Sequence, residues 1–155
     1  RTSRARRAAS GRSTGRGRKA GEDVSVLDDL YDRLTSASVA TTAELYKAVL
    51  PSTPDEVLAL FEYGGPAPVH AMTQRAVAEE PHVQVVGRAT RPDTARFRVQ
   101  RVMTELDGLG PVSINGVTYL GIYALQPPFP LRTDEAGRYE FAMNFAVTRV
   151  PATSS

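Results

Sequence analysis

The chain has 155 residues, no cysteine and a formal net charge of +2. This length suits one globular domain with an appendage, and the lack of cysteine excludes disulfide bonds and thiolate metal sites. No apolar run approaches the roughly 20 residues that a membrane-spanning helix needs, so no membrane partner is expected.

The charge is divided sharply along the chain. Eight of the 19 basic residues lie in residues 1–20, whereas all 17 acidic residues lie in residues 21–155. The second region therefore has 11 basic and 17 acidic residues and a net charge of −6. An acidic body repels phosphate, so the basic pI of the whole chain does not by itself predict a nucleic-acid-binding domain.

Residues 1–20 form a basic segment, here called the arm, and residues 21–155 form the body. The arm is rich in Arg, Ser, Gly and Ala without a hydrophobic period, so alone it is expected to be disordered. Twenty extended residues reach about 65 Å, far enough to bind carboxylates on another chain or phosphates of nucleic acid. The alternative is a solvated tail. The candidate partner-binding residues are Arg4, Arg6, Arg7, Arg12, Arg16, Arg18 and Lys19.

The body opens with an amphipathic helix over about residues 25–37. Ser25 followed by Asp28 resembles a capping box. Four apolar residues recur at helical spacing and predict a buried stripe: Val24, Leu27, Tyr31 and Leu34.

Two buried strands and a second helix are predicted next. A short apolar run, Val57–Phe61, and a β-branched run, His82–Val86, are typical of strands. Pro92 suits the first turn of a helix that extends from about Asp93 to Leu106. Its apolar face consists of Ala95, Val99, Val102, Met103 and Leu106.

The last third of the chain consists of strand signals. Asn115–Gly116 lies between two β-prone runs and predicts a hairpin with a type I′ turn. Residues 127–137 are expected to form an exposed loop because prolines interrupt the second run. Arg138–Arg149 alternates cleanly, which predicts a half-buried strand. The fold class is therefore α+β: a mixed, largely antiparallel sheet with two main helices packed on one face, plus the extended arm.

No set of residues predicts catalysis or a cofactor. His70 and His82 lack the spacing of metal ligands, and the chain has neither a phosphate-binding glycine loop nor a nucleophile elbow. The protein is therefore expected not to be an enzyme and to bind no metal.

A further group of basic residues surrounds the second helix. Arg91, Arg98 and Arg101 share a sector away from the apolar face at helical spacing. They form a candidate basic patch for phosphate or an acidic partner. The alternative is an exposed polar helix face.

Three segments carry a resemblance to a known family: LFEYGGPAP, PHVQVVGRATRPDTARFRVQRVMTEL and YLGIYALQPPFPLRTDEAGRYEFAMNFAVTRV. In this order they resemble the minor capsid or tail terminator proteins of long-tailed, siphovirus-like bacteriophages. The resemblance covers about residues 23–150 and excludes the arm. The turn VGRAT departs from the plainer arginine–glycine turn of that family.

This resemblance implies structural work in the virion. Such proteins form a ring, usually of six subunits, that caps the tail tube, stops its polymerisation and joins the head-completion proteins of the neck. DNA passes through the lumen, and assembly takes place in the host cytoplasm. Contacts with the ring or neck are expected at exposed loops, with candidate residues Asn115, Gly116, Phe129, Leu131, Asp134 and Glu135.

One alternative remains from another class of function. The protein would then be a nucleic-acid-binding capsid protein whose arm neutralises the packaged genome. A shell-forming sandwich would suit that function better than two helices and few strands.

Overall fold

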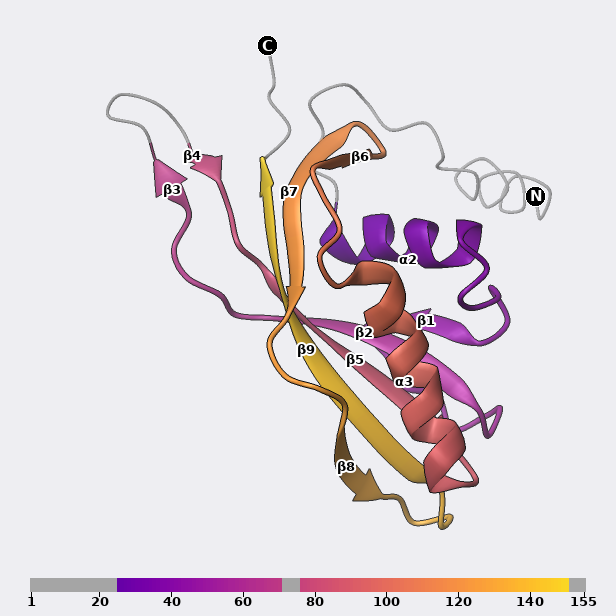
Figure 1. Ribbon diagram of the computed structural model, residues 1–155. Coiled ribbons are helices and arrows are strands. Elements are labelled where there is room, and N and C mark those ends of the chain that lie inside the picture. The colour runs from indigo at the N-terminus through magenta and orange to yellow at the C-terminus, as the bar shows by residue number, and fades with distance from the viewer. Residues whose placement is uncertain (1–24, 71–75, 151–155) are drawn as a thin grey trace, which may run out of the picture.

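A computed structural model describes residues 25–70 and 76–150 of the chain (Figure 1). The arm and Val24 lie outside this range, as do the side chains of Val69, His70, Ala76 and Val77. The predictions made for the arm, for Val24 in the helical stripe and for His70 therefore stay predictions.

The described chain forms two helices and a mixed sheet, which confirms the predicted α+β class. The helices are α2 (Val26–Ser36) and α3 (Pro92–Leu106). The strands are β1 (Leu45–Lys47), β2 (Val57–Tyr63), β3 (Val69–His70), β4 (Ala76–Ala78), β5 (His82–Ala89), β6 (Val112–Ile114), β7 (Val117–Ala124), β8 (Phe129–Thr133) and β9 (Tyr139–Val150).

Seven of these strands belong to one sheet in the order β1-β2-β5-β9-β7-β6, with β8 paired to β9 beside this path. Only β1 and β2 run parallel within it. Strands β3 and β4 form a separate two-stranded hairpin, which projects from the body (Figure 1).

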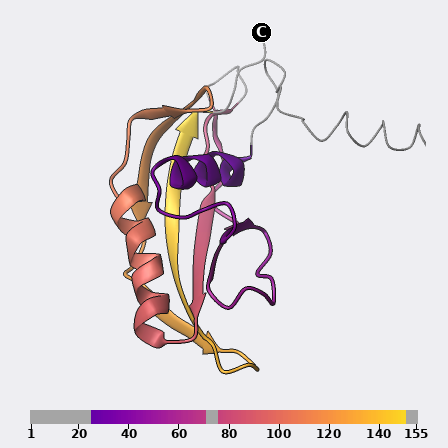
Figure 2. The same ribbon diagram turned by 90° about the vertical axis from the view of Figure 1, so that its right-hand side faces the viewer.

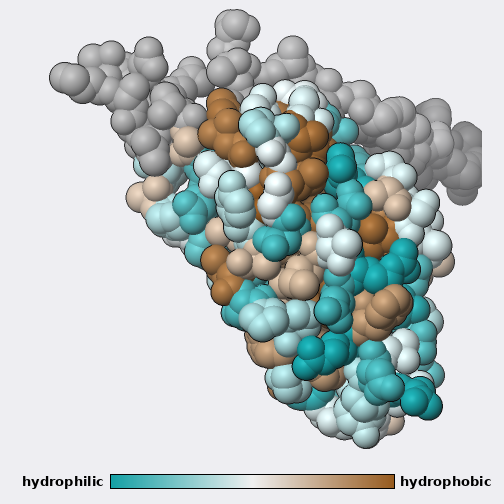
Figure 3. All heavy atoms as spheres, viewed as in Figure 1, coloured by the Kyte–Doolittle hydropathy of each residue, from teal (hydrophilic) through white to brown (hydrophobic). Residues whose placement is uncertain are grey.

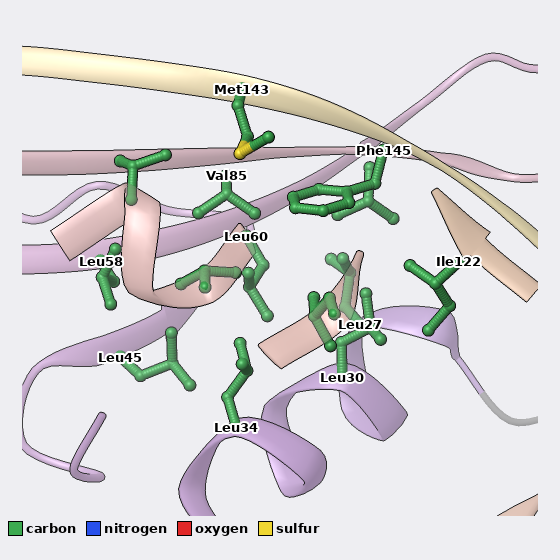
Figure 4. Packing of buried hydrophobic residues seen from close by; sticks show 14 of the residues in the cluster. Leu27, Leu30, Leu34, Leu45, Leu58, Leu60, Val85, Ile122, Met143 and Phe145 are labelled. Carbon is green, nitrogen blue, oxygen red and sulfur yellow. The ribbon is translucent and has the colours of Figure 1, made fainter. Parts of the chain in front are cut away.

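Both helices lie on the same side of the sheet, which we call the helix face; the opposite side is the far face (Figure 2). The core fills the space between the helices and the sheet. Leu30 and Leu34 of α2 point toward Leu60 and Phe145 of the sheet (Figure 4), and all four are fully buried. Hydrophobic burial of this kind is the main favourable term in folding.

Helix α2 begins where the sequence predicts. The Ser25 hydroxyl accepts a hydrogen bond from the backbone N–H of Leu27 at 3.1 Å, which caps the first turn. Leu27 and Leu34 are buried as predicted, and Tyr31 is half-buried. The prediction omitted Val26 and Leu30, which are fully buried and widen the apolar stripe.

The predicted hairpin is also present. Asn115 has φ 52° and Gly116 has φ 82°, so both central residues adopt the positive φ that a type I′ turn requires. The turn joins β6 to β7 in antiparallel register.

Two predictions for the C-terminal third were wrong. Residues 127–137 are not a continuous loop, because Phe129–Thr133 forms strand β8 on the edge of β9. Proline is tolerated on edge strands, so Pro130 concealed the strand. Strand β9 is not half-buried: Ala142 and Ala146 on its far face are also buried. The larger Val86 and Phe129 lie in register on either side of Ala142 and shield it.

The body should fold without the arm, because its buried hydrophobic residues extend from Val26 to Val147. We expect deletion of residues 1–20 to leave one cooperative thermal transition, measured by circular dichroism. Leu30→Ala in the same protein should lower the melting temperature clearly, since such core truncations cost about 2–5 kcal/mol. Loss of the cooperative transition in the deletion variant would contradict this expectation.

Candidate functional site

The titratable side chains offer no evident site for metal chemistry. Within residues 25–70 and 76–150, no group of three or more His, Cys, Asp or Glu is placed to hold a metal ion. His82 instead lies 3.3 Å from a carboxylate oxygen of Glu80 and meets the Tyr63 ring edge-on at 5.6 Å between centroids. No helix in the described ranges is long and apolar enough to cross a bilayer.

The buried charges gather instead in two networks, one at each end of the sheet. We call the first the hairpin network, formed by Asp29, Glu79, Asn115, Tyr119 and Arg149. We call the second the turn network, formed by Asp55, Arg88, Arg132, Asp134, Arg138 and Glu140.

The hairpin network is built around Asp29, a fully buried carboxylate in the first turn of α2. The Tyr119 hydroxyl donates to one carboxylate oxygen, and the side-chain amide of Asn115 donates to the other at 2.8 Å. Both donors belong to the β6–β7 hairpin. One buried acid therefore fastens the start of α2 to the hairpin, and the positive end of the helix dipole favours its charge.

Arg149 extends this network to β9 and the segment before β5. Its Nε donates to Glu79 at 2.9 Å, and its Nη1 lies 3.5 Å from the Tyr119 hydroxyl. Burial of Tyr119 is the main reason that its pKa lies above the ordinary value, and its hydrogen bond to Asp29 raises the pKa further. The hydroxyl therefore keeps its proton and remains a donor at neutral pH.

Asn115 and Gly116, predicted as contact residues, form the exposed tip of this hairpin. The Asn115 side chain is occupied inside the chain, since it donates to Asp29 and Asp32 at 2.8 Å each. The backbone of the turn is thus the part that faces outward.

The turn network lies at the opposite end of the sheet. Arg88, Glu140 and Arg132 align in register across β5, β9 and β8 on the far face. Arg88 is buried and donates to the carbonyl oxygens of Pro54 and Asp55 at 2.6 and 3.1 Å. Burial lowers the pKa of its guanidinium. The buried Glu140 accepts from Arg132 at 3.0 Å.

Asp134, another predicted contact residue, shapes the turn before β9. One oxygen accepts from the backbone N–H of Ala136 at 3.0 Å and of Arg138 at 2.8 Å, and the other accepts from the Arg138 side chain at 2.9 Å. These bonds hold the pKa of Asp134 below its ordinary value, and the hydrogen bond from the backbone N–H of Arg138 contributes most to this shift. Glu135 is exposed at the tip.

Phe129 and Leu131, the predicted apolar contact residues, differ in exposure. Phe129 is half-buried opposite Ala142, whereas Leu131 is 41% exposed. Leu131 is therefore the more available of the two for another chain.

The three arginines of the candidate basic patch have different surroundings. Arg98 bonds to Glu44 at 2.6 Å and Glu56 at 2.9 Å, which fastens α3 to the segments around β1 and β2. Arg101 donates to the carbonyl of Ser38 and is exposed, as is Arg91. The patch stays a prediction, and Arg98 is its least available member.

Viewed from the helix side, the surface is mixed and largely hydrophilic (Figure 3).

Sequence reasoning missed an aromatic row on the far face. Register pairs Tyr63 with His82, His82 with Ala146, and Ala146 with Tyr123, so these four residues align across β2, β5, β9 and β7. Tyr63 is 40% exposed and Tyr123 54% exposed. His82, Tyr123 and Ala146 lie in predicted strands, and Tyr63 lies two residues beyond the predicted run Val57–Phe61, but only the pairing of distant strands reveals the row.

The hairpin network should contribute to stability through the Tyr119 hydroxyl. We expect Tyr119→Phe to lower the free energy of unfolding by about 1–3 kcal/mol, because it removes a donor from a buried carboxylate. Urea denaturation measures the change. Tyr123→Phe is the matched control, since this tyrosine is exposed and should show little effect.

The difference in stability between the wild type and Tyr119→Phe should also depend on pH in the alkaline range. An unfolded tyrosine has a pKa near 10, and the folded-state pKa of Tyr119 is higher. The wild-type advantage over Tyr119→Phe should be complete below pH 10 and decline as pH rises further. An equal stability of the two proteins at pH 7 would contradict this role of the hydroxyl.

Comparison with known proteins agrees with the sequence resemblance. Residues 33–151 match the family described as bacteriophage tail terminator protein. No curated protein matches the chain.

Solved structures share the fold at low sequence identity. A chain from the virion of a native gene transfer agent particle has a TM-score of 0.56 and 20% identity, covering 81% of this chain and 94% of that one. A second solved chain has a TM-score of 0.52 and 12% identity, covering 84% of this chain and 100% of that one. The family match spans most of the body, so the chain belongs to the bacteriophage tail terminator family, and it is a structural, tail-associated protein of the virion.

Proposed function

We propose that this protein forms a homo-oligomeric ring, a hexamer, on the end of the phage tail tube. The ring stops polymerisation of the tube protein and joins the tail to the head-completion proteins of the neck. The genome passes through its lumen without being specifically bound. The observation that carries the proposal is the match of residues 33–151 to the tail terminator family.

A protein that joins two different structures needs two separate contact surfaces. The turn at Asn115–Gly116 and the turn at Asp134–Glu135 lie at opposite ends of the sheet (Figure 1). Each is braced by one of the two buried networks, so each is an exposed tip on a rigid base. We assign these tips, together with Leu131, to contacts with the neighbouring subunits, the tube or the neck.

The charge of the body suits passage of DNA. Residues 21–155 have a net charge of −6, and like charges repel the phosphate backbone. A lumen lined by such a body lets the duplex slide during ejection.

The function can be tested with purified tube protein. We expect the wild-type protein to form a ring by light scattering and to stop the elongation of polymerising tubes seen by electron microscopy. Leu131→Ser should leave the monomer folded but weaken assembly or tube capping, because it removes an exposed apolar contact.

Phe97→Ser is the matched control, since Phe97 is 60% exposed but lies on α3, at neither of the two turns. Tubes that elongate equally with and without the wild-type protein would refute the capping function. Equal effects of Leu131→Ser and Phe97→Ser would remove only the assignment of Leu131.

The arm is assigned to protein contacts between subunits. Arg forms bidentate pairs with carboxylates, and exposed pairs contribute only about 0–1 kcal/mol each, so such a tether works through number and repetition around a ring. The arginines also favour a second candidate, in which the arm neutralises phosphates of packaged DNA.

Empty particles distinguish these two partners. We expect replacement of six arginines of the arm by serine to weaken head–tail joining in a salt-sensitive manner while the fold stays intact. The six are Arg4, Arg6, Arg7, Arg12, Arg16 and Arg18. A protein tether predicts density for the arm in particles that lack a genome. Density that appears only with packaged DNA would favour the second candidate.

A further inference from the structure

A hollow of about 400 Å³ lies beside the end of β2, at the base of the β3–β4 hairpin. It lies at the same end of the sheet as the hairpin network and the start of α2. Its walls combine one aromatic ring, three prolines, two glycines and three glutamates: Glu62, Tyr63, Gly64, Gly65, Pro66, Pro68, Glu79, Glu80 and Pro81. The hollow is therefore partly apolar, with carboxylates around an exposed tyrosine.

The hollow keeps a negative charge. Glu79 is paired with Arg149 at 2.9 Å, and Glu80 lies 3.3 Å from His82. The exposed Glu62 has no ion pair with any residue that the structure describes. Among the residues that the structure describes, the basic side chains at the hollow therefore do not balance its three carboxylates.

We propose that this hollow binds the arm, residues 1–20, of a second copy of the chain. Charge selects this occupant among the parts of the chain outside the described residues. The arm carries eight basic residues and no acid, whereas residues 71–75 carry one base and residues 151–155 carry none. Tyr63 adds a ring face on which a guanidinium stacks, and small residues between the arginines let an extended segment approach closely.

The proposal rests on the ring described under Proposed function and identifies how its subunits join. Arm and hollow are different surfaces, so their contact is heterologous, and heterologous contacts close into rings when the rotation permits. Each subunit gives one arm and receives one. A span of about 65 Å for the arm is long enough to reach a neighbour.

The test exploits the absence of cysteine from the chain. Chains with Ser13→Cys are mixed with differently tagged chains carrying Ala67→Cys at the exposed rim of the hollow, and a short bis-maleimide is added. The two thiols are on different chains, so we expect a cross-linked heterodimer. The matched control places the second thiol at Ala136, which is exposed at the opposite end of the sheet.

A second comparison tests the charges. Glu62→Gln with Glu80→Gln in the Ala67→Cys chain should reduce the cross-linking yield by about threefold or more. Asp93→Asn in the same chain, at an exposed carboxylate on α3, should not change it. Glu79 is left intact because it belongs to the hairpin network.

Three outcomes would overturn the proposal: equal cross-linking at positions 67 and 136, a yield insensitive to Glu62 and Glu80, or cross-linking only within one chain when it carries both Ser13→Cys and Ala67→Cys. Light scattering of the wild-type protein separates this failure from that of the ring. A ring without arm cross-linking removes only the arm–hollow contact. A chain that stays monomeric and does not stop tube growth refutes the proposed function as well.

Discussion

Strand β9 is paired with other strands along both of its edges, and the rest of the body depends on that pairing. One edge bonds to the whole of β5 through residues 139–146, and the other bonds to β8 near the start of β9 and to β7 near its end. Helix α3 packs against β9 and β5. Twelve residues without proline or glycine allow this continuous ladder, because every backbone N–H is available. The position and twist of β9 therefore set where both ends of the sheet present their turns.

The charged networks restrict this ladder to one register. On the far face, Arg88, Glu140 and Arg132 align across three strands. A shift of β9 by one residue would turn Glu140 into the apolar core and expose Phe141 or Met143 on the far face. Buried ion pairs add little net stability compared with apolar residues, so their value here is that they exclude such alternative pairings. In the same way, Asp29 restricts how α2 docks on the hairpin, because it accepts hydrogen bonds from Asn115 and Tyr119.

Local patterns account for what the sequence predicted correctly. The period of apolar residues identified both helices, and Asn115–Gly116 identified the hairpin because a turn depends only on its own φ values. The networks join residues distant in sequence: Tyr119 and Asp29 are 90 positions apart, and Arg138 and Asp55 are 83. Nothing local distinguishes Asp29, which is buried, from Asp28 or Asp32. Strand β8 was missed because a proline argues against a central strand, whereas an edge strand such as β8 tolerates it.

The open edges of the sheet bear on how the protein avoids uncontrolled association. Strands β1 and β6 each offer only three residues, and β8 carries Pro130 and a register shift between Pro130 and Arg132. Short, interrupted edges cannot template the strand of another molecule, which is how natural proteins resist edge-to-edge aggregation. The sheet of this tail-associated virion protein is therefore itself a poor seed for fibre growth, although the protein works among polymerising partners.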